Sequence, residues 1–121
     1  MNLQVETRLS DQIARYIDLA SSEAKLTAAN MANIDTPGYK SLGMDFEAEM
    51  RGAIEAENQE RGVQHVKVNA VDGLIARPDG NNVSMDRESL HLADAQLKYK
   101  TGVALLRLED QRVMDAIHAD K

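Results

Sequence analysis

Few side chains in this 121-residue chain have the type and spacing that chemistry requires. His65, His91 and His118 lie far apart, and none has a second histidine four positions later, so the sequence indicates no metal site. Residues 79–82 (Asp-Gly-Asn-Asn) carry oxygen ligands but lack the alternating pattern and distal glutamate of a calcium loop, so they predict a turn. We therefore expect no catalytic residues, no metal and no cofactor, and the chain is not expected to be an enzyme.

Composition excludes several other classes of function. The net charge is -6 and the pI is about 5.0, so an acidic chain without a basic patch is a poor partner for nucleic acid or for an anionic lipid surface. No apolar run approaches the roughly 18 residues that span a bilayer, and the N-terminus lacks the pattern of a secretory signal. We expect a cytosolic protein, or one exported without a cleaved signal peptide.

The elements that must position the remaining polar residues are two long helices, the first over residues 10–33. Ser10 is the expected N-cap and Asp11 suits the positive helix start. Apolar positions in steps of three and four form a coiled-coil-like stripe. This stripe comprises Ile13, Ile17, Ala20, Ala24, Thr27, Met31 and Ile34, and a second strip comprises Leu19 and Leu26.

The second long helix is expected over residues 86–119, capped by Ser84. At 1.5 Å per residue it spans about 50 Å, which is long for so short a chain. It also carries two stripes more than about 100 degrees apart. The first comprises Leu92, Ala95, Tyr99, Val103, Leu106, Val113 and Ile117, and the second comprises Leu90, Ala93, Leu97, Ala104 and Leu108.

The middle of the chain has a different pattern. Residues 45–61 predict a charged, marginal helix, and alternation within 63–71 predicts a short strand. Turn signals at 72–73 and 79–80 favour a small β-hairpin. We therefore predict a mainly α structural unit with three parts: 1–40, an irregular or hairpin segment 41–85, and 86–121.

The helix stripes predict assembly. An antiparallel pair covers one stripe of each helix, and burying a leucine side chain contributes about 1.5–3 kcal/mol. The second stripes, which contain Leu19, Leu26, Leu90, Leu97 and Leu108, are then expected to be covered by other chains in a helical tubular assembly. The alternative is a compact monomer in which the middle segment folds back over the second stripe.

The exit of the first helix is rich in amides and turn residues. Asn30 and Asn33 lie on one side of its last turns, and Pro37 and Gly38 end the helix. Amides so close to a helix end usually bind backbone groups.

This exit resembles the N-terminal signature of the flagellar axial proteins, the rod and hook subunits of the bacterial flagellum. The family pattern is roughly Ala-Asn-Asn-Leu/Ile-Ala-Asn-x-x-Thr-x-Gly-Tyr/Phe-Lys, and the chain departs from it at Ala29 and Met31. The residues that match are Ala28, Asn30, Ala32, Asn33, Thr36, Gly38, Tyr39 and Lys40. With Pro37 included, the segment looks most like that of the B-type proximal rod subunits.

A second signature precedes the last helix. Asp79, Gly80, Asn81, Asn82 and Val83 are similar to the lead-in of the B-type rod subunits. The helix continues the pattern at 92–93, 97 and 99, whereas positions 95 and 100 carry Ala and Lys in place of the usual Asn and Gln.

The resemblance implies a structural subunit of the proximal rod that polymerises through its terminal helices and helps form the motor drive shaft. The implied partners are further copies, other rod proteins, the ring–rod junction protein and the type III export gate. The implied location is the periplasmic side of the inner membrane, without direct lipid binding. A cytosolic helical adaptor or export chaperone, and a small enzyme with a site between subunits, stay as alternatives.

Overall fold

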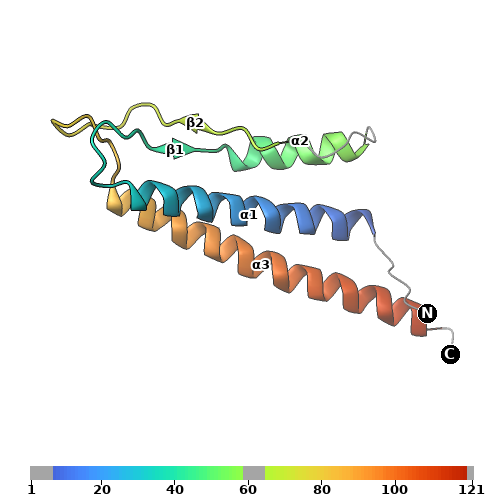
Figure 1. Ribbon diagram of the computed structural model, residues 1–121. Helices are drawn as coiled ribbons and strands as arrows, with labels where there is room; N and C mark the ends of the chain where they lie inside the picture. The colour runs from blue at the N-terminus through green and yellow to red at the C-terminus, as the bar shows by residue number, and fades with distance from the viewer. Residues whose placement is uncertain (1–6, 59–64, 120–121) are drawn as a thin grey trace.

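The computed structural model describes residues 7–58 and 65–119, and two long antiparallel helices dominate it (Figure 1). A second layer, made of a short helix and two short strands, lies along the first long helix (Figure 1). The predicted mainly α fold with long terminal helices is confirmed. The elements in chain order are α1 (Arg8–Ala32), β1 (Leu42–Gly43), α2 (Phe46–Asn58), β2 (Asn69–Ala70) and α3 (Met85–His118).

Helix α1 begins earlier than predicted, because Thr7 and not Ser10 is its N-cap. The Ser10 amide donates to the Thr7 hydroxyl at 3.0 Å, and the Thr7 amide donates to the Ser10 hydroxyl at 2.9 Å. This reciprocal capping box satisfies two backbone donors, whereas a cap at Ser10 alone satisfies one. The prediction of Ser10 as the cap was therefore wrong by three residues.

Helix α3 agrees with its prediction to within one residue at each end. Ser84 is the N-cap, and its hydroxyl accepts from the Arg87 amide at 3.3 Å. Asp86 and Glu88 lie in the first turn, where carboxylates interact favourably with the helix dipole.

The middle segment contains the predicted helix and a small antiparallel β-pair. Helix α2 ends at Asn58, and the rest of its predicted span belongs to residues 59–64, outside the described residues. Of the predicted strand 63–71, positions 63 and 64 lie outside the described residues, and strand β2 covers Asn69–Ala70 of the described part. It pairs with Leu42–Gly43, which precedes α2. The β-pair is thus present, but its partner strand precedes α2, and residues 72–73 and 79–80 form turns outside it.

The seam between α1 and α3 has a heptad repeat. The buried positions of this seam recur every seven residues, and they are Ile13, Ala20 and Thr27 on α1 and Glu88, Ala95, Gly102 and Glu109 on α3. A Cβ atom on Gly102 would lie only 2.6 Å from Ile17 Cγ1 and 3.1 Å from Tyr16 Cδ1. Small α3 residues therefore allow the larger α1 side chains to approach closely.

Two residues of the predicted inner α3 stripe lie outside this seam. Tyr99 is 47% exposed and Ile117 is 42% exposed. Tyr99 is displaced because the seam is centred on the positions of Ala95 and Gly102. Glu109 bonds to Thr7, which lies just before the start of α1. Ile117 comes later in α3 than Glu109, so it lies beyond the part of α3 that packs against α1. Of the other predicted positions on α3, Ala95 is buried, and four are half-buried: Leu92, Val103, Leu106 and Val113. Ile17 and Met31 on α1 are also half-buried.

The expectation that Leu19 needs another chain to cover it was wrong. Leu19 is fully buried and Leu26 is half-buried within the single chain. The middle segment folds back over α1, with the Phe46 ring edge-on to Tyr16 at 5.2 Å between ring centroids. The compact alternative therefore holds for the second strip of α1.

Candidate functional site

The structure brings the two signature segments together at one end of the molecule, at the left of Figure 1. There the chain leaves α1, turns back, and later enters α3. We call this cluster the signature junction, and it comprises Asn30, Asn33, residues 36–42, Arg77, residues 79–83 and Glu88.

Asn81 is the centre of the signature junction and is completely buried. Its Nδ2 donates to the carbonyl oxygens of Asn33 and Thr36, both at 2.8 Å. Its Oδ1 accepts from the Val83 amide at 2.8 Å. One side chain from the α3 lead-in therefore satisfies two carbonyls at the exit of α1.

Hydrogen bonds from backbone amides hold the two signature segments side by side. The Gly38 amide donates to the Asp79 carbonyl at 2.9 Å, and the Ser41 amide donates to Asn82 Oδ1 at 2.7 Å. Gly38 and Gly80 both have positive φ, and a Cβ on Gly80 would lie 3.4 Å from Gly38 Cα. The distance is an ordinary contact, so the positive φ of Gly80 is what explains glycine at this position.

Asn30 fastens α1 to β1 and to α3. Its Oδ1 accepts from the Leu42 amide and the Tyr39 hydroxyl, both at 3.0 Å. Its Nδ2 donates to the Leu42 carbonyl at 2.8 Å and to Glu88 Oε2 at 3.2 Å. The side chain is 1% exposed and makes all four hydrogen bonds that an amide can make.

Asn33 has a local role, in contrast to Asn30. Its Nδ2 donates to the Ala29 carbonyl at 2.8 Å, and its Oδ1 accepts from the Thr36 hydroxyl at 3.0 Å. Both bonds are exposed to solvent and complete the end of α1. The prediction that these amides bind backbone groups is confirmed for both residues.

Two cations complete the signature junction. The Arg77 guanidinium donates to the carbonyls of Ile34 and Val83, and the Lys40 ammonium donates to the Gly80 carbonyl. Sequence reasoning identified Lys40 but not Arg77, because no local pattern links position 77 to a helix end 43 residues away.

Three signature residues take no part in these hydrogen bonds. Ala28 and Ala32 lie exposed on α1, and Pro37 is exposed in the turn after it. The polar signature residues thus serve the fold of the single chain, and the two alanines belong to an open helix face.

Two buried carboxylates were missed by sequence reasoning. Glu88 is 1% exposed and accepts from Asn30 and from Arg87 Nη1 at 2.9 Å. Glu109 is 5% exposed, and it accepts from Arg112 at 2.8 and 2.9 Å and from the Thr7 hydroxyl at 2.9 Å. The hydrogen bonds from Arg112 and then Thr7 hold the pKa of Glu109 below its ordinary value. Glu88 and Glu109 are three heptads apart, and this spacing was the signal in the sequence that could have placed both on the same buried seam.

Lys98 ties α2 to both long helices. Its Nζ lies 2.8 Å from Asp94, 3.1 Å from Glu23 and 4.0 Å from the centroid of the Phe46 ring. Partial burial lowers the pKa of Lys98, but its hydrogen bonds to Asp94 and Glu23 outweigh this effect and hold the pKa above its ordinary value. The arrangement combines an ion pair with a cation–π contact.

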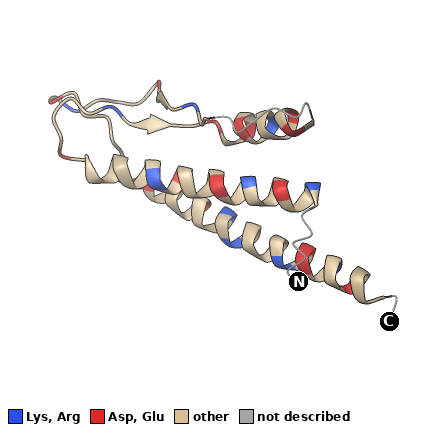
Figure 2. Cartoon of the chain, turned by 45° about the vertical axis from the view of Figure 1, so that its right-hand side comes forward, with Lys and Arg blue, Asp and Glu red and all other residues tan. Residues whose placement is uncertain are grey.

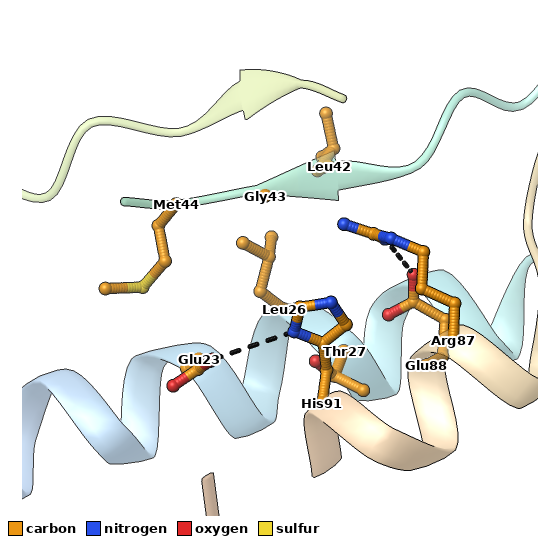
Figure 3. A pocket seen from close by; sticks show the side chains of 9 residues that line it. All are labelled: Glu23, Leu26, Thr27, Leu42, Gly43, Met44, Arg87, Glu88 and His91. Carbon is orange, nitrogen blue, oxygen red and sulfur yellow. Dashed lines mark hydrogen bonds and ion pairs between the residues drawn. The ribbon is translucent and has the colours of Figure 1, made fainter. Parts of the chain in front are cut away.

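A small cavity lies between α1, β1 and α3 (Figure 3). Its volume of about 40 Å³ suits one or two water molecules and is too small for an organic ligand. Figure 3 shows the apolar side chains of Leu26 and Met44 lining the cavity, and His91 close to Glu23. His91 Nδ1 lies 3.8 Å from Glu23, and no three potential metal ligands cluster anywhere in residues 7–58 and 65–119.

The remaining feature is an exposed apolar stripe on α3, opposite its contact with α1. Leu90, Leu97 and Leu108 are 73%, 65% and 67% exposed, and Ala93 and Ala104 between them are also exposed. We call these five residues the α3 ridge. The prediction that this second stripe is left uncovered by the single chain is confirmed.

Figure 2 shows charges of both signs along α1 and α3. No helix in the described part of the chain has the length and apolar character needed to cross a membrane.

The chain is similar to flagellar basal body rod proteins, although no family model matches it. It is 33% identical over 119 residues to the flagellar basal body rod protein FlgB of Salmonella typhimurium, covering 84% of this chain and 86% of the relative. It is 34% identical over 108 residues to FlgB of Borrelia hermsii, covering 74% and 80% of the two chains. It is 28% identical over 121 residues to FlgB of Escherichia coli, covering 85% and 88%.

Proposed function

Because the chain belongs to the FlgB family of flagellar basal body rod proteins, we propose that it joins the rod through the α3 ridge. The chain is a structural subunit of the basal body rod, and such a subunit associates with other rod proteins. The α3 ridge is the feature that supports this mode of association. The signature junction supports it indirectly, because it fixes α3 against α1 and so presents the ridge on a rigid pair of helices.

The exposed leucines supply a driving force for assembly. Each of Leu90, Leu97 and Leu108 exposes about two thirds or more of its surface. Covering them contributes roughly 1–2 kcal/mol each, or about 3–6 kcal/mol for each subunit. This gain is modest against the entropy lost on association, so assembly through the ridge requires several contacts for each subunit.

We further infer a position in the proximal rod, with the ring–rod junction protein and the export gate as neighbours. Export through the flagellar type III apparatus without a cleaved signal, and a location on the periplasmic side of the inner membrane, follow from the same resemblance. The signature residues at the exit of α1 and the entry of α3 support this assignment.

The subunit acts without catalysing a reaction. Its most organised polar cluster, the signature junction, uses its amides and cations on backbone carbonyls and amides. The relatives named above are all rod proteins, and nothing in them supports the adaptor or chaperone alternative.

Substitution in the α3 ridge tests the proposal. Leu97→Asp places a charge in the ridge, and we expect loss of incorporation into basal bodies and loss of swimming, with unchanged helicity of the purified chain. Gln96→Asp adds the same charge at the neighbouring exposed position outside the ridge and is expected to swim. Normal incorporation of the Leu97→Asp chain would overturn the proposal. Ile17→Asp also prevents incorporation, but by disrupting the seam at Gly102, so its helicity falls as well.

A further inference from the structure

We propose that the α3 ridge packs against α1 of a second copy, on the α1 face turned away from both α2 and α3. In this contact the two helices run antiparallel, Leu97 meets Ser21 of the second copy, and Leu90 meets its Ala28. The inference rests on the proposed assembly through the ridge and names the surface that receives it.

The free face of α1 has the small side chains that a leucine ridge requires. Ala14, Ser21 and Ala28 recur every seven residues, with Ala14 and Ala28 exposed and Ser21 half-buried. Leu90, Leu97 and Ala104 recur every seven residues along the ridge. Because the two repeats have the same period, each leucine can meet a small residue along the whole contact.

The contact inside the subunit already uses this complementarity in the opposite sense. There the larger side chain, Ile17, belongs to α1 and faces Gly102 of α3. At this level the inner contact joins a large α1 side chain to a small α3 residue, and the proposed contact joins large α3 side chains to small α1 residues.

The register follows from the spacing and from charge. Inside the subunit, Gly102 of α3 lies beside Tyr16 and Ile17 of α1. Because the two helices are antiparallel, Ser21, which is five residues after Tyr16, lies at the same height along the pair as position 97. A second copy at the same height places its Lys25 beside Asp94. Asp94 borders the α3 ridge, and Lys25 borders the small-residue face of α1, on the same side of the proposed contact. Asp94 accepts from Lys98 at 2.8 Å and keeps 51% of its side chain exposed, so a second cation can reach it.

Other registers are less favourable. Sliding the second copy by one heptad, so that Leu97 meets Ala14, brings Asp18 beside Asp94 and places two carboxylates together. Sliding it the other way takes Leu90 past the end of α1 at Ala32. The level register alone pairs both leucines with small residues and Asp94 with a cation.

A contact between two different surfaces does not close on itself as a two-fold dimer does. Each copy offers one ridge and one small-residue face, so copies add in a row or around a tube. The resulting wall alternates α1 and α3 helices, each contacting the other long helix of its own chain and one long helix of a neighbour.

Cysteine crosslinking tests this arrangement, because the chain contains no cysteine of its own. The Ser21→Cys/Leu97→Cys chain is expressed in motile cells in place of the natural one, and purified basal bodies are oxidised and run on a non-reducing gel. We expect disulfide-linked dimers and larger multiples of this chain. Each single variant is expected to remain monomeric, and so is the Ala14→Cys/Leu97→Cys chain, which tests the shifted register.

Each other outcome overturns the inference. Dimers from Leu97→Cys alone indicate two ridges facing each other, and multiples from the Ala14 pair indicate the shifted register. Absence of multiples from the Ser21 pair in motile cells leaves the proposed function intact but excludes this contact. Ala28→Cys/Leu90→Cys repeats the test one heptad away if the first pair does not assemble. Normal incorporation of the Leu97→Asp chain would instead contradict the proposed function, so the two failures are distinguishable.

Discussion

The strongest prediction for the fold concerns Asn81, whose amide joins the exit of α1 to the entry of α3. Asn81→Ala leaves the carbonyls of Asn33 and Thr36 and the amide of Val83 without their partner. The two carbonyl contacts are partly buried and contribute about 1 kcal/mol each, and the buried Val83 amide adds about 1–3 kcal/mol when it is left unpaired. We therefore expect the free energy of unfolding to fall by about 3–5 kcal/mol.

Urea unfolding of the full chain, followed by far-ultraviolet circular dichroism, measures this loss. With an m-value of about 1.5–2 kcal/mol/M, the midpoint should move by roughly 2 M. Asn33→Ala is the matched control, because its two side-chain contacts are exposed and its loss should be only about 0.5–1.5 kcal/mol. If the Asn81 variant were no less stable than the Asn33 variant, the signature junction would not hold the two helices together.

Three further predictions concern the helix contacts. Gly102→Leu should destabilise the chain by more than about 3 kcal/mol in the same unfolding assay, because even a Cβ overlaps Ile17; unchanged stability would contradict the close seam. Glu109→Gln should lower the stability of the chain at pH 7, because Arg112 stabilises only the ionised form of Glu109. The difference in stability from the parent chain should vanish as the pH falls below the usual carboxyl pKa of 4.5 and through the lowered value of the folded chain. A difference that does not change with pH would refute this. Phe46→Ala should release α2 and speed its cleavage by protease, with the long helices still intact on a gel.

The sequence predicted the features that depend on local spacing. The ends of α3, its Ser84 cap and the outer stripe with Leu90 and Leu97 were all predicted from periodicity and capping chemistry. These features depend on contacts within a few residues, or on the uniform geometry of a helix.

The partners of the signature amides were not predictable in this way. Asn81 bonds to residues 45 and 48 positions earlier, and Asn30 bonds to a carboxylate 58 positions later. The signature marked these residues without revealing that they meet each other. Glu88 lies in the first turn of α3, and only its closeness to Asn30 and Arg87 explains how its charge can be buried.

Leu19 was misassigned for a related reason. The middle segment has few apolar residues with which to cover a helix. It nevertheless lies along α1 because Phe46 contacts both Tyr16 and Lys98, and the β-pair continues the layer from the start of α2. A segment can therefore cover a narrow strip such as that of Leu19 without having a core of its own.

A density map of the intact basal body, at a resolution that shows side chains, tests the central claim most directly. We expect Leu90, Leu97 and Leu108 of each copy to lie against a neighbouring chain, enclosed in the wall of the rod. A map in which these three leucines face solvent, while other surfaces hold the subunits together, would contradict the account.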